Sequence, residues 1–427
     1  MNDVNAIIQW LYSLQFFGIK LGLGNTEALC RFFGDPQKRY PTIHIAGTNG
    51  KGSTSAMIAS VLQESGLRVG LYTSPHLVAF NERIRVNGAA IADADVVDFA
   101  RAMRAQVEQM QGTFFEATTA MAFRYFADQQ VDIAVIETGM GGRLDSTNVV
   151  TPVASVITSI GFDHMEHLGN DLTSIAREKA GIIKPRVPVV AGVRDREAMD
   201  MINDKARIER APLRYAYEVM KARVSNITLD GMELDLRGEL HELRGVRSPF
   251  IGMHQVENIE NATATLELLE GELRHPLSDE IYMRGIANAV VNSGLRCRLE
   301  TVRREPRIVI DVAHNPAAFD RVVETLEAIG VQRGTWVLGI MKDKDFGAVL
   351  TRVAPLCERM FCVAPPGDRA LSSKELTAAA ISAGIAAHDA GPVEQGIEHA
   401  IQSNHGETIF VAGSHYVAGE ALTVLSQ

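Results

Sequence analysis

The sequence has little cysteine, no excess of positive charge and no long apolar run among its 427 residues. Its four cysteines (Cys30, Cys297, Cys357 and Cys362) have none of the spacings of metal or redox sites, so we expect free thiols in a reducing compartment. The net charge of −10 argues against a nucleic-acid-binding protein, whose surface would be basic. No apolar stretch reaches membrane-spanning length and the N-terminus lacks a basic signal region, so we expect a cytoplasmic protein outside any membrane.

The most informative stretch that is present runs from Thr42 to Gln63. Residues 42–46 predict a buried strand, three glycines follow within residues 47–52, and residues 55–63 have helical composition. A strand that leads through a glycine-rich turn into a helix N-terminus forms an anion site, because backbone N–H groups and the helix dipole both attract negative charge. Lys51 adds a positive charge and the hydroxyl of Ser53 or Thr54 reaches Mg2+ or phosphate. The stretch therefore predicts an ATP- or GTP-binding loop.

This loop departs from the general phosphate-loop pattern. Ile45 stands where the first glycine would be, and Gly52 separates the lysine from the hydroxyl. The alternative is a glycine-rich turn that binds no ligand, and the combination of lysine, hydroxyl and helix start makes it the weaker interpretation.

Three further predicted strands each lead into a polar residue. They are residues 68–73 before Ser74, 131–136 before Glu137, and 153–160 before Asp163 and His164. Strands that alternate with helices favour a doubly wound, mostly parallel sheet, in which ligands bind beyond the carboxyl ends of the strands. We therefore expect these side chains at one edge. Each alone is explained as a loop serine, a solvated glutamate or a hydrogen-bonded histidine, but together they could form the shell of a Mg2+ bound to nucleotide phosphates, although histidine is an unusual magnesium ligand.

Lys179 is unusual because it lies on the apolar face of a predicted helix over residues 172–182, in line with Leu172 and Ile175. A lysine in that position must reach solvent with its tip, form an ion pair, lose its charge or be chemically modified. The common case is a lysine that reaches solvent or forms an ion pair.

The length favours two domains. We predict an α/β protein with a phosphate-loop domain over residues 1–294, including a small β-hairpin segment near 219–250, and a smaller Rossmann-like α/β domain over residues 295–427. Asp230-Gly231 between two alternating runs is the hairpin signal, and strands alternate again with helices beyond residue 294.

Taken together, the motifs resemble the folylpolyglutamate synthase and dihydrofolate synthase family of the Mur ligase superfamily. They occur in the family's order from about residue 8 to the C-terminus, and the family uses the short phosphate loop with glycine after lysine. The matching segments are Gly47–Ser53, Leu71–Leu77, Phe80–Arg85, Glu137–Asp145, Gly161–His164, Glu178–Ile182 and Asp311–Pro316.

The resemblance implies an ATP-dependent amide ligase. ATP phosphorylates a carboxylate, and the amino group of L-glutamate displaces phosphate from the acyl phosphate. This reaction extends the glutamate tail of folate or joins glutamate to dihydropteroate. Phosphoryl transfer needs positioning and charge neutralisation, which a glycine loop, a lysine and Mg2+ provide.

The resemblance also implies roles for individual residues. Lys179 matches a lysine that is carbamylated at the magnesium site, and Ser74, Glu137 and His164 match magnesium ligands. His314 and Ser414 match residues near the incoming glutamate. The positions that match ATP contacts are Thr48, Asn49, Gly50, Lys51, Gly52, Ser53, Asn261, Arg298 and Asp311. The positions that match the pterin site are Lys20, Leu21, Gly22, Thr113, Phe114, Phe115, Glu116, Leu144, Asp145 and Ser146.

Two departures from the family pattern leave details open. The segment Leu295–Glu300 replaces a Pro-Gly-Arg pattern, so Arg298 is the expected ATP contact and Arg296 is the fallback. Ser146 stands where alanine is frequent, which we expect to be tolerated.

Two other functions compete with the folate ligase. A peptidoglycan-precursor ligase shares the fold and a Thr-Asn-Gly-Lys loop, but we expect no separate nucleotide-sugar-binding domain before residue 40, which weighs against it. A nucleotide-hydrolysing switch or binding module without ligase activity is the alternative from another class. We expect a monomer that binds folate or dihydropteroate, L-glutamate, ATP and Mg2+.

Overall fold

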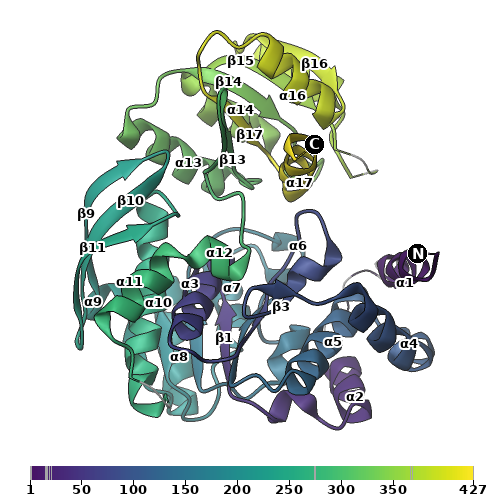
Figure 1. Ribbon diagram of the computed structural model, residues 1–427, viewed down its shortest axis with the longest axis vertical. Helices are drawn as coiled ribbons and strands as arrows, with labels where there is room; N and C mark the ends of the chain where they lie inside the picture. Colours follow the sequence, from purple (N-terminus) through teal and green to yellow (C-terminus); the bar gives the residue numbers. More distant parts are fainter. Residues whose placement is uncertain are drawn as a thin grey trace.

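The computed structural model describes residues 2–14, 18, 20, 22–273, 276–365, 367 and 369–426. Within that part of the chain the structure has a lower lobe, built on an eight-stranded sheet with a small antiparallel sheet beside it, and an upper lobe built on a six-stranded sheet (Figure 1). Among the helices formed by these residues, none is both long and apolar enough to cross a lipid bilayer.

The eight-stranded sheet has the strand order β4-β3-β2-β5-β1-β6-β7-β8. The six strands from β2 to β8 in this order are parallel, and β3 and β4 add an antiparallel edge. This confirms the predicted mostly parallel sheet. Its strands are β1 (Thr42–Ala46), β2 (Val69–Tyr72), β3 (Ile84–Val86), β4 (Ala89–Ala90), β5 (Ile133–Glu137), β6 (Ala154–Ile157), β7 (Val189–Ala191) and β8 (Leu213–Tyr215).

Helices cover both faces of this sheet. Alternate residues of a strand point to opposite faces, so Ile43 and Ile45 pack on the side of α3, whereas Ala134 and Ile136 pack on the side of α5. The helices are α1 (Asn2–Ser13), α2 (Gly24–Phe32), α3 (Lys51–Glu64), α4 (Asp93–Gln109), α5 (Phe114–Asp128), α6 (Met165–Leu168), α7 (Leu172–Ala180) and α8 (Arg196–Glu209).

The predicted hairpin is part of a three-stranded antiparallel sheet in the order β11-β10-β9. Its strands are β9 (Lys221–Thr228), β10 (Gly231–Arg237) and β11 (Glu242–Ser248), so the hairpin at Asp230-Gly231 is confirmed and the third strand is additional. The short α9 (Ala216–Val219) precedes it, and α10 (Met253–Leu269), α11 (Asp279–Ala287) and α12 (Ala289–Ser293) follow it. Apolar residues of β10 and β11 share one core with α3 and α10.

The six-stranded sheet has the order β12-β13-β17-β14-β15-β16, with only β12 antiparallel. Its strands are β12 (Glu300–Arg304), β13 (Arg307–Ile310), β14 (Gly334–Leu338), β15 (Cys357–Val363), β16 (Ala387–Gly391) and β17 (Ile409–Ala412). Its helices are α13 (Pro316–Ile329), α14 (Phe346–Val353), α15 (Ser373–Ser382), α16 (Val393–Gln402) and α17 (His415–Leu425). Residue 294 lies between α12 and β12, and a domain boundary there stays a prediction.

Helix α3, which carries Lys51, is buried along most of its length and packs closely against α11. A Cβ atom at Gly285 would lie 2.5 Å from the Cα atom of Val61. The Ser60 hydroxyl also donates to the carbonyl of Gly285 over 2.6 Å. This close approach of two helix backbones fixes α3 against α11, which follows the three-stranded sheet.

We therefore expect Gly285→Ala to destabilise the protein by about 1–3 kcal/mol, because a helix backbone cannot move aside as a flexible side chain does. Urea unfolding measures the change. Gly271→Ala is the matched control, since a Cβ atom at Gly271 meets nothing within 4 Å. Equal urea midpoints for the two variants would contradict the packing argument.

Candidate functional site

The turn between β1 and α3 has two positions that admit only glycine. At Gly47 (φ +158°) a Cβ atom would lie 1.9 Å from Thr158 Oγ1, and at Gly50 (φ +85°) it would lie 2.1 Å from Asn258 Oδ1. Gly50 also begins α3 in a left-handed conformation that residues with side chains rarely adopt. The end of β6 and helix α10 therefore press directly on the turn.

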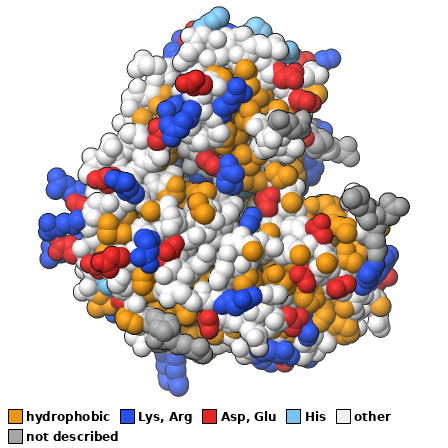
Figure 2. Space-filling view, in the orientation of Figure 1, with side chains coloured by type: hydrophobic (Ala, Val, Ile, Leu, Met, Phe, Trp, Pro, Cys, Tyr) orange, Lys and Arg blue, Asp and Glu red, His pale blue; other side chains and the backbone are white. Residues whose placement is uncertain are grey.

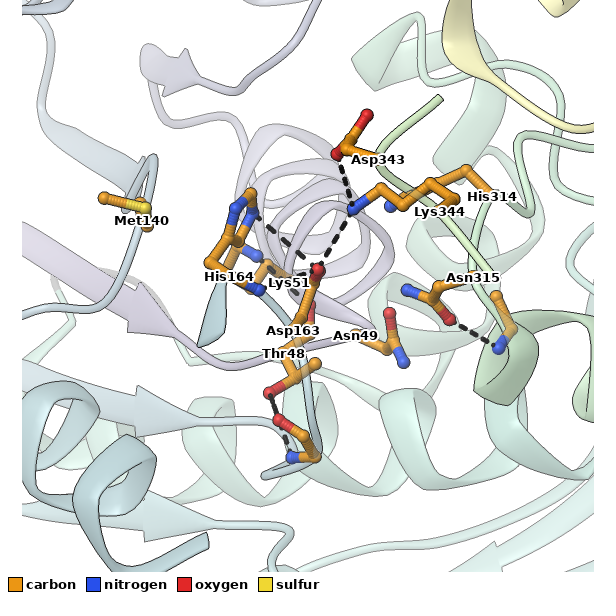
Figure 3. A network of polar contacts seen from close by, with 12 residues as sticks. Thr48, Asn49, Lys51, Met140, Asp163, His164, His314, Asn315, Asp343 and Lys344 are labelled. Carbon is orange, nitrogen blue, oxygen red and sulfur yellow. Dashed lines mark hydrogen bonds and ion pairs between the residues drawn. The ribbon is translucent and has the colours of Figure 1, made fainter. Parts of the chain in front are cut away.

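The loop after β6 holds the backbone of this turn in place. The N–H of Thr48 donates to the carbonyl of Ser159 over 2.8 Å, and the N–H of Asn49 donates to the Ser159 hydroxyl over 3.0 Å. The Thr48 hydroxyl donates to the carbonyl of Gly161 over 3.0 Å (Figure 3). A turn fixed on both sides presents the N-terminus of α3 in one orientation, as an anion site requires.

Two lysine ammonium groups converge on one carbonyl of the turn. Lys51 Nζ donates to the carbonyl of Gly47 over 3.1 Å, and Lys179 Nζ from α7 donates to the same oxygen over 2.9 Å. Lys179 is only 4% exposed, so the sequence prediction of an apolar-face lysine is correct and its tip does not reach solvent. Burial and then the charge of Lys51 lower the pKa of Lys179 to about 7. A large fraction of its amine is therefore neutral at pH 7.

Glu137 ends β5 beside the turn, and its carboxylate is buried. Burial raises the pKa of Glu137 to about 6, although Lys51, the N–H of Ser74 and Arg298 all favour the charged form. The N–H of Ser74, at the end of β2, donates to Glu137 Oε2 over 3.3 Å. The predicted meeting of these strand ends is confirmed by the adjacent strands β2, β5 and β1.

His164 lies in the loop after β6, in a left-handed conformation, with its side chain 46% exposed. The preceding Asp163 points across the space between the lobes, where Lys344 Nζ lies 3.4 Å from its Oδ1 (Figure 3). Among the described residues, no group of three or more His, Cys, Asp and Glu side chains could hold a metal ion. A magnesium site here would therefore depend on Ser74, phosphate oxygens or a modified Lys179 in addition to Glu137 and His164.

Arg298 reaches the turn from the connection between the lobes. A Cβ atom at Gly52 would lie 3.7 Å from Arg298 Nη2 and 3.8 Å from Glu137 Oε2, so both side chains flank the start of α3. Arg296 instead pairs with Glu300, whose Oε1 lies 2.6 Å from its Nε. Of the two arginines considered from the sequence, the one at the turn is Arg298.

The other residues that we predict to contact the nucleotide differ in how deeply they are buried. Asp311, after β13, accepts hydrogen bonds from the N–H groups of Leu299 (2.7 Å) and Ala313 (2.6 Å). Asn261 is fully buried in α10 and its Nδ2 donates to the carbonyl of Thr158 over 3.5 Å. Its Oδ1 has no partner among the described residues, and neither has Nδ2 of the buried Asn315 near the turn. Buried polar atoms without partners suit a polar ligand such as a nucleotide.

His314 and Ser414 come from two neighbouring strand ends of the upper lobe. The ring centroids of His314 and His415 lie 5.4 Å apart, and burial lowers the pKa of both imidazoles, so both are neutral near pH 7. The Ser414 hydroxyl accepts a hydrogen bond from the N–H of Val417 over 3.1 Å and so caps α17. Both residues belong to the upper lobe, which Figure 1 shows above the lobe that carries β1 and α3.

The polar part of the predicted pterin site forms one cluster at the start of α5. The N–H of Thr113 donates to Glu116 Oε2 over 2.7 Å, and Asn25 of α2 donates to the same oxygen over 3.1 Å. Lys20 Nζ donates to the carbonyl of Gln111 over 2.6 Å, which brings the segment around residue 20 to this point. Gly22 lies in the same connection, and Leu21 lies outside the described residues.

The aromatic part of this predicted site packs on the same helix end. Phe114 stacks on Tyr12 with ring centroids 5.8 Å apart, and Phe115 lies so close to Gly139 that a Cβ atom there would be 2.5 Å from its ring. Asp145 accepts hydrogen bonds from the N–H groups of Met140 and Thr147, both within 3.0 Å.

Asp145 begins the 3-10 helix Ser146–Val149, which contacts α5 and α2, while Leu144 is half-buried. The structure therefore brings the three predicted segments together.

Several residues of this region are not predicted from the sequence. Asn258 packs over Gly50, Lys344 pairs with Asp163 across the lobes, and Arg83 is buried against Phe114. Only Arg83 falls in a motif singled out above, and nothing in the spacing of Asn258 or Lys344 indicates contact with residues more than 180 positions away.

The fold and the site define a ligase that uses ATP and is built from two α/β lobes, and comparisons with known proteins agree. Residues 45–266 match the Mur ligase middle domain, and residues 297–415 match the Mur ligase, glutamate ligase domain. The chain is 36% identical over 416 residues to the dihydrofolate synthase/folylpolyglutamate synthase of Bacillus subtilis, with 95% of each covered.

Solved structures give the same result. Mycobacterium tuberculosis folylpolyglutamate synthase complexed with ADP and AMPPCP superposes with a TM-score of 0.90 at 31% identity, covering 100% of this chain and 99% of that one. Escherichia coli FolC in complex with DHPP and ADP has a TM-score of 0.86 at 29% identity, covering 98% and 97%. The chain belongs to the folylpolyglutamate synthase and dihydrofolate synthase family of Mur ligases.

We expect Glu137→Gln to lower activity by about 100-fold or more and to raise the Mg2+ concentration needed for half-maximal rate, because the neutral amide is a much weaker ligand for Mg2+. Steady-state rates over a Mg2+ titration measure both effects. Glu108→Gln, an exposed carboxylate on α4, is the control. If Glu137→Gln responded to Mg2+ as the wild type does, Glu137 would be excluded as a magnesium ligand.

We expect Lys179 to react with dissolved carbon dioxide, because its neutral amine attacks the carbon and becomes a carbamate. With 13C-labelled bicarbonate, the carbamate signal in the NMR spectrum should increase as the pH rises through about 7, where the amine loses its proton. Lys179→Ala should lose that signal and ligase activity together, and high bicarbonate should partly restore activity. Lys184→Ala is the control, since Lys184 also donates to a backbone carbonyl, that of Asn148. An active Lys179→Ala variant would refute the assignment.

Proposed function

We propose that this chain adds L-glutamate both to reduced folates and to 7,8-dihydropteroate, through an acyl phosphate formed with ATP. The observation that carries the proposal is the convergence of Lys51, Lys179 and Glu137 on the turn after β1. Two lysines and one carboxylate at a helix N-terminus suit the binding of a nucleoside triphosphate together with a divalent metal ion.

In the first step a carboxylate oxygen of the acceptor attacks the terminal phosphorus of ATP, and the bond to ADP breaks. The backbone N–H groups of the turn and the Lys51 ammonium would hold the phosphates, with Asn49, Gly50 and Gly52 contributing main-chain contacts. Ser74, Glu137 and His164 would hold Mg2+, which neutralises phosphate charge when bound. Carbamylation of Lys179 would replace a buried cation with an anion at this metal site.

In the second step the amino group of glutamate attacks the acyl carbon, the bond to phosphate breaks and the nitrogen loses a proton. His314 and Ser414 would bind the incoming glutamate, because they follow β13 and β17, two neighbouring strands of the upper lobe. Arg298 and Asp311 would hold the nucleotide from the same side, and the closeness of Arg298 to Gly52 supports this.

The acceptor would lie along the start of α5. The pterin ring is flat, aromatic and rich in hydrogen-bonding groups, and the cluster of Thr113, Glu116 and Asp145 beside Phe114 and Phe115 supports such a ring. These carboxylates are already oriented by backbone N–H groups, so little entropy is lost when a ligand binds.

We also propose that the protein works as a monomer in the cytoplasm. The four cysteines are buried free thiols, as expected in a reducing compartment.

Phosphate release from ATP tests the proposal when dihydropteroate and a reduced folate monoglutamate are supplied in parallel, each with and without glutamate. We expect glutamate-dependent release with both, and products one glutamate heavier by mass spectrometry. Release with the folate alone would exclude the dihydropteroate reaction. ATP turnover that ignores acceptor and glutamate would favour a nucleotide-hydrolysing switch, and binding of a UDP-sugar substrate would favour a peptidoglycan-precursor ligase.

A further inference from the structure

Arg83 is a buried cation in the lower lobe, at the end of the 3-10 helix Phe80–Arg83 and just before β3. It is 7% exposed, and its guanidinium carbon lies 5.1 Å from the ring centroid of Phe114. Among the residues that the structure describes, no carboxylate forms an ion pair with it. Its side chain donates a hydrogen bond from Nε to Nδ1 of His76 over 2.7 Å.

His76 does not balance this charge. Nδ1 accepts from Arg83 and therefore carries no proton, while Nε2 lies 3.1 Å from the hydroxyl of Tyr12. Since Nδ1 carries no proton, the ring holds at most the one proton on Nε2 and bears no charge. The two groups in contact with the guanidinium, Phe114 and His76, are thus uncharged, and the carboxylate of Glu137 acts on it from beyond ion-pair distance. A buried charge without a counter-ion is costly, and it is far less so once an anion binds beside it.

The position of Arg83 joins two parts of the site. Its carbonyl accepts a hydrogen bond from the N–H of Thr73 over 3.0 Å, so it flanks the strand end that carries Ser74. Glu137 is close enough for the two charges to influence each other. The other side of the guanidinium rests on Phe114, at the start of α5, and in Figure 1 β3 lies between the phosphate turn and α5.

The acceptor substrates named above have a matching shape. Each has a flat ring at one end and a carboxylate at the other, and that carboxylate must reach the terminal phosphate of ATP. A molecule whose ring lies by Phe114 and Phe115 and whose other end lies by Glu137 passes the guanidinium. Arginine binds carboxylates through two parallel hydrogen bonds, and Nη1 and Nη2 of Arg83 make no ion pair with the described part of the chain.

We propose that Arg83 is a substrate-binding residue that pairs with a carboxylate of the acceptor and holds the acceptor's anionic end between Phe114 and the phosphate turn. This inference rests on the proposed function, because it assigns a subsite to the same substrates. The stacking of Arg83 on Phe114 favours the acceptor over the incoming glutamate as the source of the carboxylate. Dihydropteroate offers only the reacting carboxylate, whereas a folate monoglutamate also offers the neighbouring one.

Equilibrium binding without ATP or glutamate tests the proposal directly, so no turnover is needed. The probes are dihydropteroate, a reduced folate monoglutamate, and the dihydropterin that carries an unsubstituted aniline in place of the aminobenzoate. The variants are Arg83→Gln and Arg83→Lys. The matched control is Arg124→Gln, since Arg124 also lies over a phenylalanine ring (5.9 Å from the centroid of Phe33) but has a carboxylate partner in Asp128.

We expect the wild type to bind a carboxylate-bearing acceptor about 10- to 100-fold more tightly than the aniline probe, as for the loss of a charged hydrogen-bonded contact. Arg83→Gln should remove this preference while it leaves the affinity for the aniline probe unchanged, and Arg83→Lys should retain part of it. If Arg83→Gln weakens the binding of both acceptors equally, the carboxylate that pairs with Arg83 is the reacting one. If it weakens the binding of the folate alone, the partner of Arg83 is the neighbouring carboxylate. Arg124→Gln should behave as the wild type.

Two results would overturn the inference. One is an Arg83→Gln variant that keeps the full preference for carboxylate acceptors, and the other is a variant whose only kinetic change is a higher KM for glutamate. Thermal unfolding shows whether Arg83→Gln folds, and Arg83→Lys carries the test if it does not. A wild type that binds neither acceptor nor the aniline probe would instead refute the proposed function, so the two failures are distinguishable.

Discussion

The structure of this site depends on one carbonyl oxygen, that of Gly47, which accepts hydrogen bonds from the ammonium groups of both Lys51 and Lys179. Two like charges held this close repel each other, and the effect is strongest where one of them is buried. The repulsion is relieved by an anion bound at the turn, by loss of a proton from Lys179, or by conversion of that amine to a carbamate. Helices α3 and α7 and strand β1 meet at this point, so the contact depends on the positions of all three elements. Figure 2 shows a hollow between the two lobes, with charged side chains at its rim.

The sequence predicts the part of the site that depends on regular topology. Ser74, Glu137 and the loop of His164 follow parallel strands, and parallel strands necessarily bring their carboxyl ends to one edge. It does not predict which of two nearby arginines faces the turn. Cys297 (φ +61°) and Leu299 (φ +48°) both have positive φ, and these local reversals place Arg298 at the turn and Arg296 beside Glu300. Such a chain path has no signal in residues that are neither glycine nor asparagine. Lys344 and Asp163 are also beyond sequence reasoning, since their contact joins distant segments.

The elements that sequence reasoning misses are those whose composition contradicts their role. β12 (Glu300–Arg304) and β16 (Ala387–Gly391) lie at the two edges of the six-stranded sheet. β12 is largely polar and β16 consists of small residues with His388 and Asp389, so both lack the run of large apolar residues that marks the central strands. β11 contains a glycine and three charged residues, and α17 contains Gly419 in its interior. That glycine has a packing reason, because a Cβ atom there would lie 2.1 Å from the carbonyl oxygen of Leu77 in the loop after Ser74.

The ion pair between Lys344 and Asp163 has a consequence for how the two lobes respond to ligands. Both side chains are mostly shielded from solvent, and Asp163 directly precedes His164, whose ring nitrogen lies 3.8 Å from its carboxylate. A divalent cation bound near His164, as proposed above, would compete with the ammonium of Lys344 for this carboxylate. Cation binding and the contact between the lobes would then be thermodynamically coupled, and such coupling is reciprocal. If the cation weakened the contact by a given free energy, opening the contact would strengthen cation binding by the same amount. One carboxylate would then link the state of the upper lobe to metal binding on the lower lobe.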